Sequence, residues 1–107
     1  MQIQNLFRDL PALEEGEWCE TLLTCRQVVI ERIASSERVA PTLYDQVQDE
    51  GVCLLQGAAD LWIDGESVTL VAGDSLFIPA HRPHRVLRTS GDPPCLWLAV
   101  HIHPSEV

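Results

Sequence analysis

The sequence predicts a single-domain all-β protein, and three observations carry that prediction. The chain has 107 residues, a length that fits one domain and leaves no room for a second. Between residues 18 and 103 no apolar pattern has a helical period of useful length. Short runs rich in β-branched and aromatic residues instead alternate with turn signals, as in sandwiches and barrels. We expect one domain over residues 1–107, in which an arm of residues 1–17 precedes a β-barrel of residues 18–103.

The first 17 residues predict an arm with at most a short helical turn. Leu6, Leu10 and Leu13 follow helical spacing, but Pro11 interrupts the pattern because a proline inside a helix removes a hydrogen bond. The leucines still need burial, and such an arm commonly packs across an open sheet edge or onto a second subunit. We therefore expect a homodimer.

The expected strands are short and separated by turn chemistry. The dipeptide Asp64-Gly65 signals a hairpin, because glycine takes a positive φ without steric cost. Side chains alternate along a strand, so a strand through Tyr44 and Gln46 would point both to one face, with Glu50 if no bulge intervenes. The other expected strands span residues 18–23, 27–34, 51–56, 58–64, 67–71, 76–78, 84–88 and 95–103.

Charge excludes several classes of function. Sixteen acidic residues oppose seven arginines, lysine is absent, and the formal net charge is -9. We therefore expect no binding to nucleic acid or to an anionic membrane. Without lysine the chain has no Schiff-base or phosphate-loop lysine, and no apolar run approaches the ~20 residues of a membrane helix.

The cysteines predict a reducing compartment. Cys19, Cys25, Cys53 and Cys95 show neither C-x-x-C pairs nor zinc-site spacing, so we expect free thiols. No secretory signal precedes them. The sequence predicts a soluble, cytoplasmic protein.

One stretch combines a turn, a short strand, a stiff loop and two histidines. Gly73 begins the turn, Pro79 ends the strand because it has no N–H to donate, and His84 begins the next strand. Glycine, five residues, proline, four residues and histidine resemble the second motif of the cupin family. The match departs at His81, where the family has a second glycine, and at Arg88, where it has an asparagine.

The second half of the first cupin motif is present as well. Glu50, six residues and then Gly57 fit that motif, while Tyr44 and Gln46 stand where the family has two histidines. The resemblance covers roughly residues 41–88. It implies a cupin-type β-barrel, a double-stranded β-helix or jelly roll, with the N-terminal arm outside it.

The resemblance also implies a metal site with a reduced ligand set. Metal-binding cupins use two histidines and a glutamate from the first motif and a histidine from the second. Glu50 and His84 keep ligand identity here, and Gln46 can offer an amide oxygen to a divalent iron, manganese or zinc ion. The alternative is that Tyr44 and Gln46 only line a polar barrel interior, Glu50 is a solvated charge and His84 a loop histidine.

The stiff loop offers further candidates for catalysis and ligand binding. His81 or Tyr44 is expected as the acid or base, and an imidazole titrates near neutral pH. Arg82, together with two nearby arginines, Arg85 and Arg88, either guides a carboxylate or phosphate or pairs with the excess acids. The ligand-binding set is expected to contain Tyr44, Gln46, His81 and Arg82.

Two histidines near the C-terminal end form a separate candidate. His101 and His103 alternate with Ile102, so they share a strand face and could pair on a metal. The sequence assigns them no definite role.

Two functions from different classes follow. The first is a metal-dependent enzyme, dioxygenase-, isomerase- or lyase-like, acting on a small oxygenated compound. The second is a non-catalytic, metal-free cupin that binds a small ligand or acts as a sensor. Loss of both first-motif histidines favours the second, and retention of Glu50 and His84 favours the first.

Overall fold

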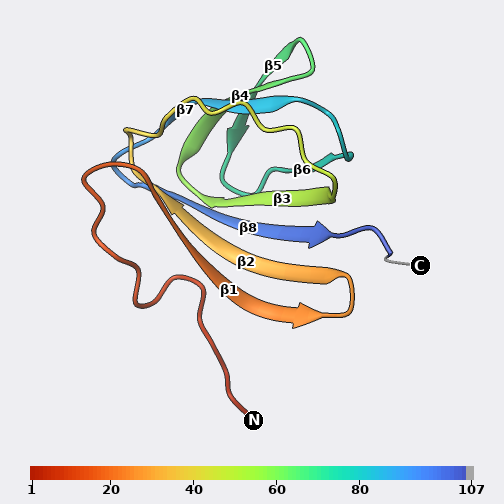
Figure 1. Ribbon diagram of the computed structural model, residues 1–107. Coiled ribbons are helices and arrows are strands. Elements are labelled where there is room, and N and C mark those ends of the chain that lie inside the picture. The colour runs from red at the N-terminus through yellow and green to blue at the C-terminus, as the bar shows by residue number, and fades with distance from the viewer. Residues whose placement is uncertain (106–107) are drawn as a thin grey trace.

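The computed structural model describes residues 1–105 and shows two antiparallel β-sheets packed face to face (Figure 1). A five-stranded sheet has the order β1-β2-β8-β3-β6, and a three-stranded sheet above it in the figure has the order β5-β4-β7. The expected all-β barrel is confirmed. The strands are β1 (Glu17–Cys25), β2 (Val28–Ser35), β3 (Asp49–Gln56), β4 (Ala58–Ile63), β5 (Glu66–Val71), β6 (Ser75–Ile78), β7 (His84–Thr89) and β8 (Cys95–Ile102).

The core lies between the sheets and follows from the alternation of side chains along each strand. In β3 the burial pattern alternates, so that Glu50, Val52 and Leu54 point inward. Leu61 from the opposite sheet and Trp97 from β8 meet them. Each large apolar side chain buried there contributes roughly 1.5–3 kcal/mol to folding. Toward one end of the barrel, the inward positions of these strands carry polar side chains such as Glu50. The rigid sheets therefore hold a polar site at that end.

The turns obey the expected chemistry. Asp64 and Gly65 have φ values of 47° and 92°, and they join Ile63 of β4 to Glu66 of β5 in a two-residue hairpin. The hairpin predicted from this dipeptide is therefore confirmed. The four cysteines are free thiols, as expected. The described residues include no helix that could cross a membrane.

The strand expected through Tyr44 and Gln46 does not form. Tyr44 makes one isolated bridge, in which its N–H donates to the His84 carbonyl at 2.8 Å and its carbonyl accepts from the His84 N–H at 3.0 Å. The ladder does not continue because Arg82, the residue that would form the next hydrogen-bonded pair, donates its N–H to the Pro79 carbonyl at 3.2 Å in a turn. Gln46 instead accepts a backbone hydrogen bond from His81 at 2.8 Å.

A buried arginine fixes the N-terminal arm to the outer face of β1 and β2. Arg32 is 3% exposed, and its Nη1 donates to the carbonyls of Leu6 at 2.9 Å and Arg8 at 2.7 Å. Its Nε donates to Glu20 at 2.7 Å. Residues 1–16 contain no helix or strand, in agreement with the expectation from Pro11, and β1 begins at Glu17. It packs on a sheet face of its own chain and not along an edge.

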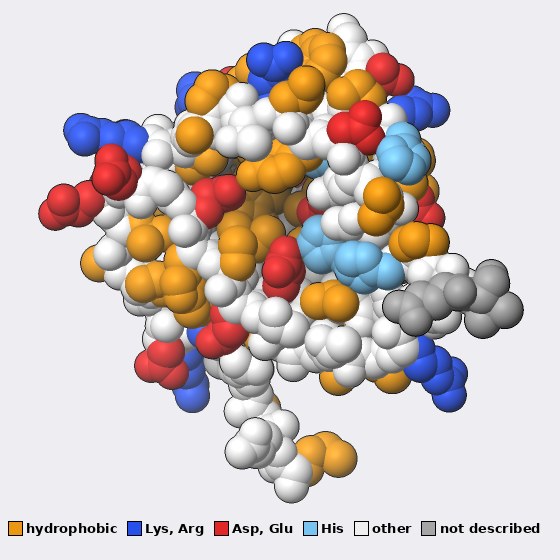
Figure 2. Space-filling view, viewed as in Figure 1, with side chains coloured by type: hydrophobic (Ala, Val, Ile, Leu, Met, Phe, Trp, Pro, Cys, Tyr) orange, Lys and Arg blue, Asp and Glu red, His pale blue; other side chains and the backbone are white. Residues whose placement is uncertain are grey.

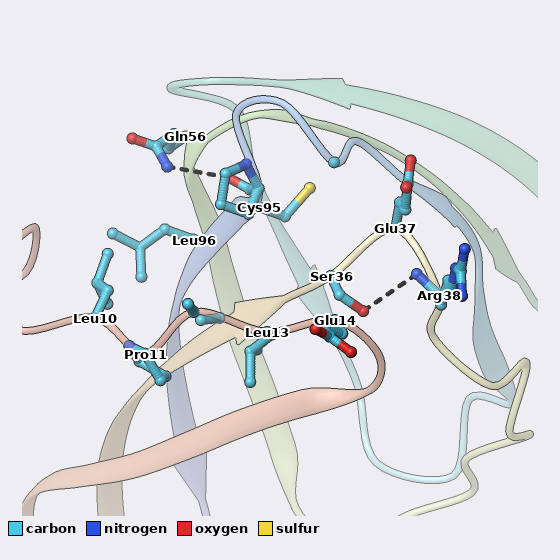
Figure 3. A pocket seen from close by; sticks show the side chains of 14 residues that line it. Leu10, Pro11, Leu13, Glu14, Ser36, Glu37, Arg38, Gln56, Cys95 and Leu96 are labelled. Atoms are coloured by element: carbon cyan, nitrogen blue, oxygen red, sulfur yellow. Dashed lines mark hydrogen bonds between the residues drawn. The ribbon is translucent and has the colours of Figure 1, made fainter.

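Beyond the arginine, the arm closes one side of a groove (Figure 3). Leu10 and Leu13 of the arm line this groove of about 480 Å³ together with Ala34 and Leu96 of the barrel. The arm leucines are therefore partly buried against the barrel.

Replacing Arg32 with methionine should detach the arm. The change leaves two carbonyls and the Glu20 carboxylate without their donor, and we expect a loss of about 2–4 kcal/mol in the free energy of unfolding. Urea unfolding measures the loss, and limited proteolysis reports cleavage before Gly16. Arg88→Met is the matched control, because Arg88 pairs with Asp60 on the exposed surface and should matter far less. Equal effects of the two substitutions would contradict the anchor.

Gly57 should resist substitution more than Gly65, although both have a φ of 92°. A Cβ at Gly57 would lie 2.6 Å from Ser90 Oγ and 3.1 Å from Cys95 Cα, whereas one at Gly65 meets nothing within 4 Å. Alanine carries the same backbone strain at both sites, so steric overlap accounts for the difference. We expect Gly57→Ala to lose about 1–3 kcal/mol more than Gly65→Ala in chemical denaturation. Similar losses of stability for the two substitutions would contradict the expected steric overlap at Gly57.

Candidate functional site

A cavity of about 240 Å³ lies between the two sheets and opens on one side of the barrel. Figure 2 shows the hollow near the middle of that side, with acidic and histidine side chains at its border. Apolar side chains, among them Val52, Leu61, Ile78 and Trp97, form part of its wall. The cavity is therefore an apolar cup with a polar mouth, the usual form of a small-molecule site.

Four of the predicted site residues meet in this cavity: Tyr44, Gln46, Glu50 and His84. Glu50 on β3 and His84 on β7 are each 9% exposed. Gln46 Nε2 donates to Glu50 Oε1 at 2.9 Å, and the Tyr44 and His84 rings stack with centroids 5.5 Å apart. The two cupin-like motifs thus come together in space.

The orientation of His84 is fixed by the loop before it. His84 Nδ1 lies 3.0 Å from the carbonyl oxygen of Arg82. Because a carbonyl oxygen only accepts, Nδ1 carries the proton, and Nε2 of the neutral ring keeps its lone pair. One nitrogen is thereby reserved for a donor or acceptor role inside the cavity.

His81 shows why the family has glycine at this position. Its φ is 62°, in the left-handed region that glycine enters freely and other residues enter at a cost of about 1–2 kcal/mol. The backbone conformation is kept although the residue differs. The exposed imidazole lies with Nδ1 2.9 Å from an oxygen of Asp45.

The structure does not bring His81 or Arg82 into the cavity, so neither expected role is supported by their placement. Both side chains are exposed on the loop before β7, and Arg82 lies 3.5 Å from Asp64. The backbone explains this, since the Arg82 carbonyl is turned toward the His84 ring while its side chain points outward.

The other two arginines of the cluster also lie outside. Arg88 donates to Asp60 at 2.9 Å, and this hydrogen bond, followed by one from Thr69, lowers the pKa of the Asp60 carboxyl. Arg85 stacks over Trp62, with its guanidinium carbon 5.0 Å from the ring centroid. Pairing of Arg82 and Arg88 with acids, the alternative to anion guidance, is what the structure shows.

Four polar cavity residues escaped the sequence analysis as site members: Glu17 and Cys19 of β1, Glu31 of β2 and His101 of β8. For His101 the sequence did offer a signal. Alternation along the strand places His101 on the same face as Trp97, so a buried Trp97 indicates that His101 also points inward. What the sequence could not supply was the register that places Glu50 opposite His101. A local sequence pattern does not show which residues of two strands far apart in the chain will face each other.

His101 connects two of the cavity acids. Its Nε2 lies 2.8 Å from Glu31 Oε1, and its Nδ1 lies 4.0 Å from Glu50 Oε1 and 3.3 Å from Gln48 Nε2. His103 lies beside it, with ring centroids 6.3 Å apart. Because both His101 nitrogens already face partners, the geometry gives His101 a hydrogen-bonding role and does not support metal binding by the pair.

The polar mouth is strongly acidic. Burial raises the pKa of the Tyr44 phenol, and the negative charges of Glu17, Cys19 and Glu50 raise it further. Burial likewise raises the pKa of the Cys19 thiol, with Glu31 and Glu17 adding to it. At neutral pH Tyr44 is therefore a neutral hydrogen-bond donor, and Cys19 is a thiol of low nucleophilicity.

The residues present fall short of the expected metal site. Within residues 1–105, no group of three or more histidine, cysteine, aspartate or glutamate side chains is arranged to hold a metal ion. His84 and Glu50 are two donors, and the Gln46 amide nitrogen already engages Glu50. Catalytic zinc sites, for comparison, use three protein ligands. The iron, manganese or zinc site that the resemblance implies is thus not supported by the donor set.

Titration of Tyr44 can test this electrostatic description, because it is the single tyrosine of the chain. Phenolate absorbance should give a midpoint above the ordinary value of about 10. Glu17→Gln should lower that midpoint by removing the acidic side chain with the largest effect. Glu66→Gln, at the exposed start of β5 and outside the cavity, should leave it unchanged. An unshifted wild-type midpoint would contradict the acidic mouth.

Comparison with known proteins agrees with this geometry. The cupin domain family model matches residues 29–101. A Ralstonia eutropha protein described as a candidate mannose-6-phosphate isomerase is 37% identical, with a TM-score of 0.90 over 97% of this chain and 100% of that one. A Thermus thermophilus protein has 24% identity and a TM-score of 0.82 over 97% and 100% of the two chains. A Desulfitobacterium hafniense cupin superfamily protein has 22% identity and a TM-score of 0.78 over 89% and 84%.

The two less similar structures establish the fold alone. No curated protein matches the sequence. The family model spans most of the barrel, and the residues of both motifs line one cavity. The chain therefore belongs to the cupin family.

Proposed function

We propose that the barrel binds one small, uncharged, polyhydroxylated compound in its cavity and does so without a metal ion. One observation carries this proposal. Three carboxylates, from Glu17, Glu31 and Glu50, converge on a cavity whose described lining contains no arginine. An anionic ligand would meet repulsion there with no arginine or lysine to offset it, and placing like charges together in a desolvated site costs roughly several kcal/mol.

The size of the cavity limits the ligand. A volume of about 240 Å³ equals the share of about eight liquid waters. A compound of roughly ten non-hydrogen atoms fits this space by volume. Larger glycans would extend into solvent.

The polar groups at the mouth complement hydroxyl groups. Carboxylates accept hydrogen bonds, the neutral Tyr44 phenol donates one, and His84 Nε2 accepts or donates according to its protonation. A hydroxyl group can satisfy both kinds of partner. The Trp97 and Tyr44 rings in the lining offer apolar faces for a sugar-like carbon skeleton.

The similarity to the Ralstonia eutropha protein bears on the ligand. Its description names a phosphorylated sugar. A sugar agrees with the cavity of this chain, because the polar groups of the lining complement hydroxyl groups. A phosphate group would lie among carboxylates. We therefore assign the cavity an unphosphorylated ligand.

A metal-dependent enzyme is the second candidate. The observation in its favour is that Glu50 and His84 are both buried in the same cavity and that the Arg82 carbonyl holds His84 Nδ1, leaving Nε2 free. It has weaker support because, in the described part of the chain, no group of three histidine, cysteine, aspartate or glutamate side chains is arranged around a metal position. Metal analysis of tag-free protein separates the two, since stoichiometric iron, manganese or zinc would favour the enzyme.

The binding proposal is tested by calorimetry with EDTA-treated protein and matched sugars. We expect neutral aldoses and polyols to bind at least about tenfold more tightly than their phosphates or acids, because the anions meet the carboxylates. Glu50→Gln should weaken binding of the neutral ligand, and it should reduce the difference in affinity between neutral and anionic sugars. Glu66→Gln, outside the cavity, serves as the control. Tighter binding of the phosphate, or binding only after metal addition, would contradict the proposal.

A further inference from the structure

A fully buried serine lies behind the wall of the cavity. Ser35 is the last residue of β2, and it does not itself line the cavity. It pairs with Glu17 at the start of β1 and with Cys95 at the start of β8, so it lies between these two strands (Figure 1). Alternation along β2 turns its side chain to the same face as Ile33 and Glu31, which both line the cavity. The Ser35 hydroxyl therefore points toward the site from beneath it.

The Ser35 hydroxyl joins two residues of the cavity wall. Its Oγ donates to Glu17 Oε2 at 2.9 Å and accepts from Trp97 Nε1 at 3.0 Å. A carboxylate only accepts and an indole N–H only donates, so the direction of both hydrogen bonds is fixed. The bond to the carboxylate polarises the hydroxyl and thereby strengthens the bond from Trp97. The Glu17 carboxylate and the Trp97 indole are thus held as one unit.

Without this hydrogen bond the Glu17 carboxylate would be mobile. Glu17 is exposed at the cavity mouth, and an exposed glutamate has many rotamers, whose loss on ligand binding opposes affinity. The backbone before it is already fixed, because the Gly16 N–H donates to the Arg38 carbonyl at 2.9 Å and the Gly16 carbonyl accepts from the Ser36 N–H at 3.1 Å. The Ser35 hydroxyl restricts what remains free, the side chain. It engages Oε2, so Oε1 can accept a hydrogen bond from a ligand hydroxyl.

We propose that Ser35 is a positioning residue of the ligand site and that, through it, the cavity selects a closed sugar ring over an open-chain polyol. The inference rests on the proposed function, because it concerns the same cavity and the same neutral ligand. A fixed hydrogen-bond acceptor beside a fixed aromatic ring suits a ligand whose hydroxyl groups and C–H surface keep a constant spatial relation. A sugar ring meets this condition, whereas an open chain must first lose the rotational freedom of several bonds.

A purely structural role for Ser35 makes a different prediction. Ser35 would then only satisfy the buried Trp97 N–H, and its loss would lower stability without changing which ligand binds. Ser36 offers the matched comparison, because it is also buried, donates to the Gly16 carbonyl at 3.0 Å and accepts from the Arg38 N–H at 3.1 Å. It lines the groove beside the arm and not the cavity. Alanine at either position therefore removes a buried hydroxyl with two hydrogen bonds, but only Ser35 is connected to the cavity wall.

Calorimetry with the EDTA-treated full chain tests the proposal with two probes, methyl xylopyranoside, whose ring cannot open, and xylitol. The wild-type protein should bind the glycoside at least about tenfold more tightly than xylitol. Ser35→Ala should weaken binding of the glycoside about tenfold and that of xylitol at most about twofold, so that the preference for the ring is lost. Ser36→Ala should leave both affinities within about twofold, although urea unfolding should show a similar loss of stability for the two variants.

A double-mutant cycle shows whether Ser35 acts through Glu17. Glu17→Ala removes the side chain that Ser35 positions. In that background, adding Ser35→Ala should change the affinity for the glycoside by less than about threefold, against about tenfold in the wild-type background. Effects of the two substitutions that simply multiply would overturn the positioning role.

Failure of this inference differs from failure of the proposed function. Equal binding of the two probes by the wild-type protein, or an unchanged preference in Ser35→Ala, overturns the positioning role while binding of neutral compounds stands. A wild-type protein that binds neither these probes nor aldoses overturns the proposed function and the preference for the ring with it.

The link between Glu17 and Trp97 is also tested without a ligand. The indole N–H resonance of Trp97 in NMR spectra, assigned with Trp97→Phe, should move in Glu17→Ala, because the Ser35 hydroxyl loses the carboxylate that polarises it. It should keep its position in Ser36→Ala. An unmoved resonance in Glu17→Ala would show that the hydroxyl does not connect the two side chains, and would overturn the proposal.

Discussion

Strict alternation of side chains across the five-stranded sheet is the constraint on which the rest of the structure depends. β8 lies between β2 and β3, and its inward row runs from the buried Trp97 through Ala99 to His101 in the cavity. Its outward row is aliphatic. One strand thus supplies the core, the polar site and the outer apolar face, and a slip of one residue in register would exchange them. Such a slip is unfavourable, because it would turn the aliphatic row of β8 into the polar site and His101 onto the apolar outer face.

The cavity concentrates groups that a core normally excludes. Glu50 is 9% exposed, yet its recorded partners are the Gln46 amide and an imidazole nitrogen 4.0 Å away. Burial of a carboxylate without a close cation costs free energy, and the aliphatic layer beneath offsets that cost. Local conflict of this kind is typical of functional sites, where the arrangement is kept for the ligand.

Sequence pattern was sufficient for the fold and for half of the site. β-branched runs and turn dipeptides such as Asp64-Gly65 act locally, so strand positions were predictable within a few residues. The cupin-like spacing located Glu50 and His84. Pattern failed at Tyr44, where the turn from Pro79 to Arg82 on a distant segment ends the pairing, and at Glu31 and His101, which meet Glu50 through non-local register. The sequence also gives no periodic pattern from which the direction of a loop side chain can be predicted, and Arg82 was therefore expected inside the cavity.

The position of β8 has a consequence for how the chain folds. β8 comes after every other strand in the sequence, yet it joins the β1–β2 hairpin to β3. Until it emerges during synthesis, that hairpin has no partner on its inner edge and β3 lacks one neighbour. Folding must then close a loop of about seventy residues between Ile30 and Val100, and pairings of such separation are slow to form. During that interval the apolar edges of β2 and β3 are open to chaperones or to other nascent chains.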